Sequence, residues 1–491
     1  MVLGWHPATV RSARAAAGVG GAHGTCEAGE SRWRDGALVQ GALEGDEGRE
    51  IDVSLATPEE IRNLQRALYT KAKQEPEFRF YSLYDKVYRW DILVHAWKLC
   101  RSNRGSAGVD GMTFADIEKF GAQEWLKALQ EEVRREQYKP APVRRVLIPK
   151  PGGVGERPLG IPTIRDRVVQ MAAKLVLEPI FEATFDDAAY GYRPRRSAID
   201  AVEKVHATVR KGHIQVVDAD LSKYFDTIPH TELLECLARR ISDGRMLHLI
   251  KMWLKTPVEE TDDRGRKRLV GGKSSTCGSP QGGVISPLLA NVYMHRFIKA
   301  FRKYDLEKKY GAVLVTYADD FVVLCRAGAR PVHDRISRWM TQIGLTLNPQ
   351  KTSVRRVWEE SFHFLGYTFG VSHTAGTGQR HLSVSPSKKA IKRFRVAIRE
   401  KLRRGAPTPV VDVIKNLNRT IRGWGLYFCF GRVGPTRYAL DKYVAERVRA
   451  FLRQRHKIAG RGARRFSYEV IRNQLGVLSL SALPRRQTAH V

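Results

Sequence analysis

The stretch Val313-Leu-Val-Thr-Tyr317-Ala-Asp-Asp320-Phe-Val-Val-Leu324 places two adjacent acids between two short apolar runs. The runs are rich in β-branched residues and predict the strands of a hairpin with the acids at its tip. Adjacent carboxylates repel each other, whereas divalent cations bound to their oxygens would reverse that cost. The plainer alternative is ordinary turn chemistry, because Asp is common in turns.

A second acidic stretch, Val216-Val-Asp-Ala-Asp220, ends another apolar run. Asp218 and Asp220 alternate with Ala219, so in a strand both side chains point to the same face. A carboxylate from this strand would complete a cage for two cations about 4 Å apart, the arrangement that promotes phosphoryl displacement. Each cluster alone is compatible with turn chemistry, but the two together in a basic chain favour a metal site.

The charge of the chain indicates its partners. Of 491 residues, 84 are Lys or Arg and 51 are Asp or Glu, which gives a formal net charge of +33. Such an excess of positive charge predicts a nucleic acid as the binding partner, because each phosphate that a Lys or Arg neutralises releases condensed counterions and so favours binding. The alternatives are an anionic membrane surface and a ribosomal scaffold.

The remaining composition narrows the cellular context. There is no run of 18 apolar residues, no apolar signal-peptide core, and no C-x-x-C pair or zinc spacing among the six cysteines. Scattered cysteines of this kind predict reduced thiols and a cytoplasmic location without membrane contact. The length leaves room for two to four domains.

Strand-like and helical runs alternate along the chain without a glycine-rich dinucleotide loop, which predicts an α+β fold. Thr57-Pro-Glu-Glu60 predicts a helix N-cap at Thr57, and Ser197-Ala-Ile-Asp200 a capping-box start. From Ser387 onward we expect basic helices, because residues 388–465 contain 23 Lys or Arg against 4 acids. The other expected elements are a loop at 101–111, strands at 143–149, 159–161, 214–217 and 364–369, and helices at 165–177, 197–210, 230–241, 288–302 and 332–343.

The acidic stretches belong to an ordered series of motifs. The series resembles that of the reverse transcriptases encoded by bacterial group II introns, also called intron maturases, over about residues 55–460. The resembling segments are 103–111, 148–160, 190–198, 218–226, 278–291, 317–320, 344–352, 364–367 and 421–428.

The resemblance implies a right-hand polymerase with an α+β fingers-palm reverse transcriptase fold followed by an α-helical thumb/maturase domain. The expected division is a disordered or loosely attached leader (1–54), a helical N-terminal extension (55–112), fingers and palm (113–372), the basic thumb (380–465) and a short C-terminal tail (466–491). Because no Cys follows Cys429, we do not expect the HNH endonuclease that many family members carry.

The resemblance also implies the catalytic residues. Asp220, Asp319 and Asp320 match the family's catalytic acids and would bind two Mg²⁺ ions, for which Mn²⁺ would substitute. Asp218 is expected to be an outer or solvent-facing acid, and Asp226 to hold the turn. Trp424, Tyr427 and Phe428 are expected to form thumb core rather than to stack on bases.

Nucleotide and template contacts are implied in the same way. The nucleotide site would comprise Lys150, Arg157, Phe225, Gln281, Gly282 and Lys351. Phe225 would exclude a ribose 2′-OH, with an ordinary core Phe as the alternative; Lys150, Arg157 and Lys351 would meet phosphates, with solvated surface charges as the alternative. Arg193, Arg195 and Arg196 precede a predicted helix N-terminus and are expected to bind template phosphate.

The implied activity is RNA-directed DNA polymerase activity: addition of deoxynucleoside triphosphates to the 3′-OH of a DNA or RNA primer on an RNA template. The implied partners include group II intron RNA, whose splicing and mobility the protein would promote. Two alternatives stay open at this point: an RNA-binding splicing cofactor that does not use its polymerase site, and a relative adopted by its host for defence or another task. The sequence defines neither the oligomeric state nor the particular RNA or target DNA.

Overall fold

The computed structural model describes residues 56–149, 155–262, 264–374, 376–403 and 408–486. Its helices are α1 (Glu59–Gln74), α2 (Tyr84–Val87), α3 (Trp90–Asn103), α4 (Phe114–Phe120), α5 (Ala122–Arg134), α6 (Ile164–Glu182), α7 (Ala198–Arg210), α8 (Tyr224–Thr227), α9 (His230–Ala238), α10 (Gly244–Leu254), α11 (Ser286–Lys303), α12 (Leu306–Tyr310), α13 (Ala329–Gln342), α14 (Lys388–Lys401), α15 (Val410–Tyr427) and α16 (Gly434–Arg455), with a π-helical turn, η1 (Val470–Gln474). Its strands are β1 (Val143–Pro149), β2 (Glu156–Ile161), β3 (Gln215–Asp220), β4 (Pro257–Thr261), β5 (Lys267–Gly271), β6 (Val313–Tyr317), β7 (Asp320–Cys325), β8 (Ser353–Arg356), β9 (Phe362–Phe364), β10 (Tyr367–His373) and β11 (Arg380–Pro386).

Helices α1, α2 and α3 pack against α6, which is buried along most of its length. Helix α1 begins at Glu59 with Pro58 at the cap position and no side-chain cap bond, so the predicted Thr57 N-cap is wrong. Proline is suited to this place because it has no N–H to leave unpaired. The predicted loop at 101–111 begins later than expected, because α3 continues to Asn103.

A first four-stranded sheet, the outer sheet, has the order β2-β1-β4-β5. The predicted hairpin pairs β1 with β2, and β2 begins at Glu156, three residues earlier than expected. Strands β4 and β5 were not predicted, because their polar sequences lack the alternation of apolar residues that marks a half-buried strand.

A second four-stranded sheet, the acid-bearing sheet, has the order β6-β7-β3-β8 and is antiparallel throughout. Alternate residues of its strands enter two different hydrophobic cores. Val217 and Phe321 belong to the core around α6 and α11, whereas Val216 and Val322 belong to the core shared with the C-terminal helices. The sheet therefore separates the two cores, and each face is covered.

The predicted strand at 364–369 is in fact a tight hairpin. Leu365 and Gly366 both have positive φ angles, of 49° and 79°, and form a two-residue loop between β9 and β10. Paired positive φ values are typical of the type I′ turn that matches the twist of a hairpin. A third strand, β11, completes this small sheet and leads into α14.

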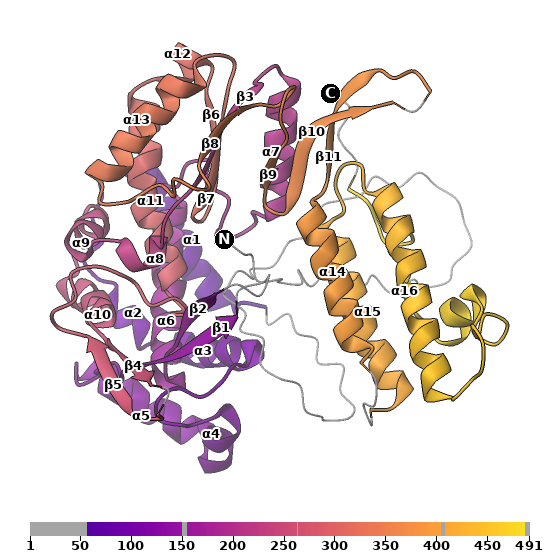
Figure 1. Ribbon diagram of the computed structural model, residues 1–491. Coiled ribbons are helices and arrows are strands. Elements are labelled where there is room, and N and C mark those ends of the chain that lie inside the picture. Colours follow the sequence, from indigo (N-terminus) through magenta and orange to yellow (C-terminus); the bar gives the residue numbers. More distant parts are fainter. Residues whose placement is uncertain (1–55, 150–154, 263, 375, 404–407, 487–491) are drawn as a thin grey trace, which may run out of the picture.

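Helices α14, α15 and α16 lie side by side at the C-terminal end of the fold, next to β10 and β11 (Figure 1). Residues 466–486, which we expected to be a tail, pack into the same core through buried residues that include Ile471 and Leu480. No helix among the described residues has the length and apolar content needed to span a membrane.

Candidate active site

Two carboxylates face each other across the acid-bearing sheet. Asp220, the last residue of β3, is the direct partner of Asp320, the first residue of β7. Directly opposed residues of an antiparallel pair carry their side chains on the same face, with Cβ atoms about 5 Å apart. This is the face on which Val216 and Val322 enter the core shared with the C-terminal helices. The acids therefore lie on the side of the sheet that faces those helices.

The third acid, Asp319, lies in the hairpin loop itself. Tyr317 pairs with Asp320, so Ala318 and Asp319 form a two-residue loop between β6 and β7. Ala318 has a φ of 57°, a value that favours glycine, and it is buried. This confirms the predicted hairpin, although its loop has two residues, whereas four residues (317–320) separate the strands that the sequence predicted.

The electrostatic environment of the acids is unfavourable for negative charge. Burial raises the pKa of Asp320 well above its usual range, and the charges of Asp319 and Asp220 raise it further. Burial also raises the pKa of Asp319; Asp220 adds to the rise, and the Arg157 guanidinium opposes it. Burial raises the pKa of Asp218 to about 7, against the lowering effect of Arg355. Nearby positive charges therefore offset only part of the negative charge of the cluster.

Lys351 supplies part of that positive charge. Its Nζ lies 2.8 Å from Oδ2 of Asp220, and the loop that carries it is joined to β3 because Asn348 N–H donates to Asp220 O at 2.8 Å. The other carboxylate oxygen of Asp220, Oδ1, is buried and has no hydrogen-bond partner. Such an atom is costly unless a cation or donor meets it.

The donor set fits a hard divalent cation. Carboxylate oxygens are the ligands that Mg²⁺ prefers, and a cation beside Oδ1 would satisfy that atom and relieve the repulsion among the acids. Among the described residues, however, no group of three or more His, Cys, Asp or Glu side chains is close enough to form a finished metal site. The fold brings Asp220, Asp319 and Asp320 to the same end of the sheet, but their carboxylate groups would have to move closer together to bind one cation.

A glycine-rich loop links the outer sheet to this site. Gly160 N–H of β2 donates to Gln281 O at 2.6 Å, and a side chain at Gly282 would collide with Gly160 O. On the other side, Ser279 N–H donates to Phe225 O at 2.7 Å. The loop therefore holds Gln281 and Gly282 between β2 and α8.

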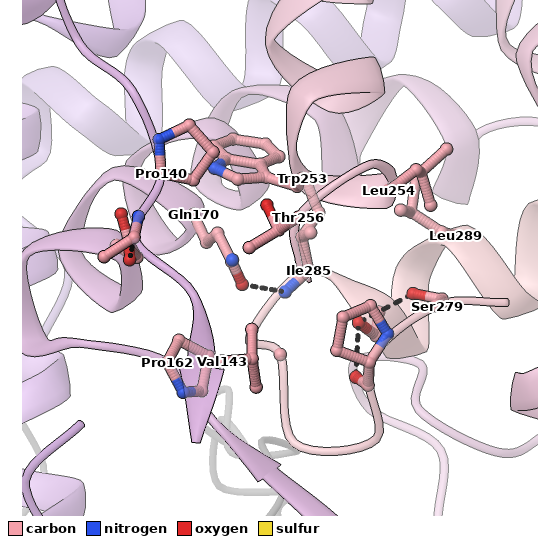
Figure 2. Close-up of a pocket in the computed structure, with 15 residues that line it drawn as sticks. Pro140, Val143, Pro162, Gln170, Trp253, Leu254, Thr256, Ser279, Ile285 and Leu289 are labelled. Carbon is pink, nitrogen blue, oxygen red and sulfur yellow. Dashed lines mark hydrogen bonds between the residues drawn. The ribbon is translucent and has the colours of Figure 1, made fainter. Parts of the chain in front are cut away.

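Gln170 of α6 supports the same loop from behind. Its Oε1 accepts the Val284 N–H at 2.8 Å and the Ile285 N–H at 3.5 Å. Figure 2 shows Gln170 directed at Ile285 in the small cavity behind the loop, which Trp253 also lines. The sequence around Gln170 did not predict this role. A glutamine in an apolar helix looks the same in the sequence whether or not its side chain supports a distant loop.

Phe225 lies in α8, five residues after Asp220. It is half-buried and packs edge-on against Tyr192, with ring centres 6.2 Å apart, and against Tyr224 at 5.7 Å. Asp226, next to it, is exposed, and its backbone N–H closes the turn by donating to Lys223 O.

Arg157 lies in β2, opposite Ile148. Burial raises the pKa values of Asp319 and Asp226, and the charge of Arg157 opposes both rises, which places Arg157 within electrostatic reach of the acids. Lys150, its expected companion at the hairpin tip, lies outside the described residues.

The structure corrects the expected role of Arg193. Its side chain is 3% exposed, and its guanidinium donates to both carboxylate oxygens of Glu182 and to the carbonyls of Asp186 and Ala189. An arginine with its donors engaged in this way is a framework residue and does not present a fork to phosphate.

The neighbouring helix N-terminus is also occupied. Ser197 and Asp200 form the predicted capping box, so the carboxylate of Asp200 already meets the first turn of α7. Arg196 pairs with Asp187 and lies over the Tyr190 ring, whereas Arg195 is exposed. Of the three arginines, Arg195 alone is left fully at the surface.

The aromatic residues of α15 form core, as expected. Trp424 is fully buried against Phe394 and Phe428, with ring centres 5.1 and 4.7 Å away. Tyr427 donates its hydroxyl to Leu365 O at 2.9 Å. Burial raises the pKa of Tyr427, and the charge of Asp320 contributes, so this helix reaches the neighbourhood of the acids.

Comparison with known proteins gives two family matches. Residues 148–369 match the reverse transcriptase (RNA-dependent DNA polymerase) family, and residues 391–468 match the group II intron, maturase-specific domain. Both matches agree with the position of the acids in the first region and the helical core in the second.

Individual relatives support these matches. Protein YkfC of Escherichia coli is 33% identical over 367 residues, which cover 67% of this chain and 93% of that protein. The group II intron-encoded protein LtrA of Lactococcus lactis is 34% identical over 220 residues, 45% of this chain and 35% of LtrA. An uncharacterized 91 kDa protein in the cob intron of Schizosaccharomyces pombe is 27% identical over 426 residues, 70% of this chain and 50% of that protein.

The chain thus spans half or less of the latter two relatives and nearly all of the first. The two family matches and the long alignment with YkfC agree with the motif series and with the acid-bearing sheet. The chain belongs to the family of group II intron-encoded reverse transcriptases and maturases.

Proposed function

We propose that this protein extends the 3′-OH of a DNA or RNA primer with deoxynucleoside triphosphates on an RNA template, and that Asp220, Asp319 and Asp320 are its catalytic acids. The observation that carries the proposal is the direct pairing of Asp220 with Asp320, beside a loop that bears Asp319. Three carboxylates on the end of one sheet, with a deficit of positive charge, suit a reaction that brings cations and phosphates together.

Two Mg²⁺ ions, or Mn²⁺ in their place, would be held by these three acids and would supply activation of the attacking hydroxyl and stabilisation of the leaving pyrophosphate. The residues around the acids would handle the substrate. Arg157 would bind the triphosphate with its guanidinium fork, together with Lys150. Lys351, already 2.8 Å from Asp220, would neutralise charge as the nucleotide enters.

The glycine-rich loop and Phe225 would position the base and sugar. Gln281 and Gly282 lie between β2 and α8, where backbone groups can approach a nucleotide closely. Phe225 would exclude a 2′-OH by steric contact. Arg195 and Arg196 remain candidates for template phosphate, and Arg193 is removed from that set because its donors are used internally.

The basic helices would bind RNA. The excess of Lys and Arg over residues 388–465 supports a surface for the template–primer duplex and for group II intron RNA. The described cysteines are all free, which supports work in the cytoplasm. In this proposal residues 55–112 form the N-terminal extension, 113–372 fingers and palm, and 380–465 the thumb.

A second function, promotion of intron splicing, is favoured by the maturase-specific match at residues 391–468. The two functions separate by experiment. Replacing both Asp319 and Asp320 with Ala should abolish primer extension on an RNA template while the affinity for RNA, measured by filter binding, stays within about twofold. Extension that survives the double substitution would show that these acids are not catalytic.

A further inference from the structure

A short segment runs beside the outer edge of the acid-bearing sheet. Tyr190 N–H donates to Thr316 O at 2.9 Å, and Thr316 N–H donates to Ala188 O at 2.8 Å. Ala189 and Thr316 thus form a parallel bridge, one residue before β6 ends at Tyr317. The segment therefore arrives at the hairpin loop from the side opposite to β7.

Gly191, the next residue, touches the loop itself. A Cβ built on Gly191 would overlap the backbone nitrogen of Ala318 and would lie 3.0 Å from the carbonyl carbon of Tyr317. Contacts under 3.0 Å are not tolerated, and backbone atoms cannot swing aside as a flexible side chain can. The φ of Gly191 is not in the left-handed region, so its backbone would accept an L-residue, and the contact alone requires glycine.

Asn291 holds Gly191 in this place. Its side chain, on α11, is 8% exposed and donates through Nδ2 to Gly191 O at 2.8 Å. A buried amide that bonds a backbone carbonyl fixes the position of that carbonyl, because losing the bond leaves a buried polar group unpaired.

The rest of the segment is anchored on both sides. Arg193 ties it to Glu182 at the end of α6 and bonds the carbonyls of Asp186 and Ala189. Arg302 of α11 binds the carboxylate of Asp186 through two nitrogens, at 2.9 and 2.7 Å. Residues 186–193 thus form a rigid support between α6, α11 and the hairpin loop.

We propose that Gly191 and Asn291 are positioning residues for the polymerase reaction: they press the support against Ala318 and so fix Asp319 relative to Asp220. This inference rests on the proposed function, because it assigns the effect of the contact to the catalytic acids. Reactions that depend on positioned groups lose rate steeply when those groups move by about 1 Å. The two residues act through backbone contact and touch no substrate.

The test compares the full-length protein with three variants. Gly191→Ala introduces the collision, and Asn291→Asp removes the donor while keeping the shape of the side chain. Gly244→Ala is the matched control, because that glycine begins α10, has no positive φ, and has open space where a Cβ would lie. Three quantities are measured: the extension rate at saturating nucleotide, the affinity for template–primer, and deuterium uptake of the peptide covering residues 313–324.

We expect Gly191→Ala and Asn291→Asp to lower the extension rate by about tenfold to hundredfold. Deuterium uptake in the peptide should rise in both, while template–primer affinity stays within about twofold and Gly244→Ala matches the wild-type protein. If both variants match Gly244→Ala in extension rate, or if uptake is unchanged in both, the inference is overturned. Should the wild-type protein fail to extend primers at all, the proposed function falls, and the uptake comparison still decides whether the two residues hold the loop.

Discussion

The ammonium group of Lys351 lies 2.8 Å from Oδ2 of Asp220, whose side chain is only 5% exposed, while Lys351 itself is 42% exposed. The contact pairs a buried carboxylate with a partner that can reach solvent. The other carboxylate oxygen of Asp220, Oδ1, has no hydrogen-bond partner. Lys351 therefore balances only part of the charge at the end of β3.

Lys351→Ala should make the protein more dependent on Mg²⁺ for stability. Without the ammonium group, Asp220 gains more from a bound cation, and a ligand that binds only the folded state raises the melting temperature. We expect the Mg²⁺-induced rise in Tm, followed by differential scanning fluorimetry, to be larger in Lys351→Ala than in the wild type. Lys308→Ala, which breaks an exposed pair with Asp305, serves as control. Equal rises in the three proteins would contradict the prediction.

Phe225→Ala should relax the choice of sugar. If the ring excludes a 2′-OH by contact, its removal should lower the discrimination between deoxynucleotides and ribonucleotides by at least about tenfold. The measurement is the ratio of kcat/KM for the two substrates with the same template. Phe225→Tyr keeps the ring and should keep the discrimination. A ratio that does not change in Phe225→Ala would leave Phe225 as a packing residue against Tyr192 and Tyr224.

The stability of the protein should fall in acid partly through His295. Burial lowers the pKa of His295 to about 4, and Lys299 contributes. The pKa of His295 is lower in the folded than in the unfolded state, so below pH 6.5 the unfolded state binds a proton that the folded state does not. The contribution of His295 to the free energy of unfolding is therefore complete above pH 6.5 and is lost as the pH falls from 6.5 toward about 4. Urea unfolding across that window should show a shallower decline for His295→Leu than for the wild type. Replacement of the exposed His248 by Leu should leave the slope as it is.

Asp441 should be essential to the C-terminal helices. Its carboxylate accepts bonds from Arg472 Nη2 (2.9 Å), Ser479 Oγ (2.8 Å) and Leu480 N–H (2.8 Å), and it is 2% exposed. Asp441→Ala leaves the guanidinium of Arg472, whose side chain is 10% exposed, without its carboxylate partner, and we expect a loss of about 3 kcal/mol in the free energy of unfolding. Chemical denaturation measures it, with Glu446→Ala, an exposed acid on the same helix, expected to change stability by less than about 0.5 kcal/mol. A similar effect of both substitutions would refute the role given to Asp441.

Local sequence patterns were sufficient to predict the hairpin that carries Asp319 and the capping box at Ser197, because both depend on residues within a few positions of each other. The pairing of Asp220 with Asp320 depends on residues 100 positions apart. Its register is set by which side chains enter which core, and a single sequence does not display that. The motif series predicted that the three acids act together, and the structure shows that Asp220 lies directly opposite Asp320.

Arginines were the least predictable part of the site. The sequence does not distinguish Arg193 from Arg195, since both lie in the same basic stretch. In the structure Arg193 is buried in a hydrogen-bond network, whereas Arg195 is exposed. The difference arises from Glu182 and from backbone carbonyls that only the fold brings near. Gly191 and Asn291 were missed for a related reason: each lies inside a motif segment, but the contact that needs it is with another segment.

The acid-bearing sheet, which divides the two hydrophobic cores, has a consequence for how the protein can be subdivided. Val216, Val315, Val322 and Leu324 are buried in the core that α14, α15 and α16 complete. A fragment that stops at the end of β11 would keep Asp220, Asp319 and Asp320 and lose those helices as cover. Its sheet would then offer an apolar surface to water beside its charged end, and such surfaces drive self-association. Recombinant fragments without the C-terminal helices should therefore aggregate, so a preparation for enzymology should retain α14, α15 and α16.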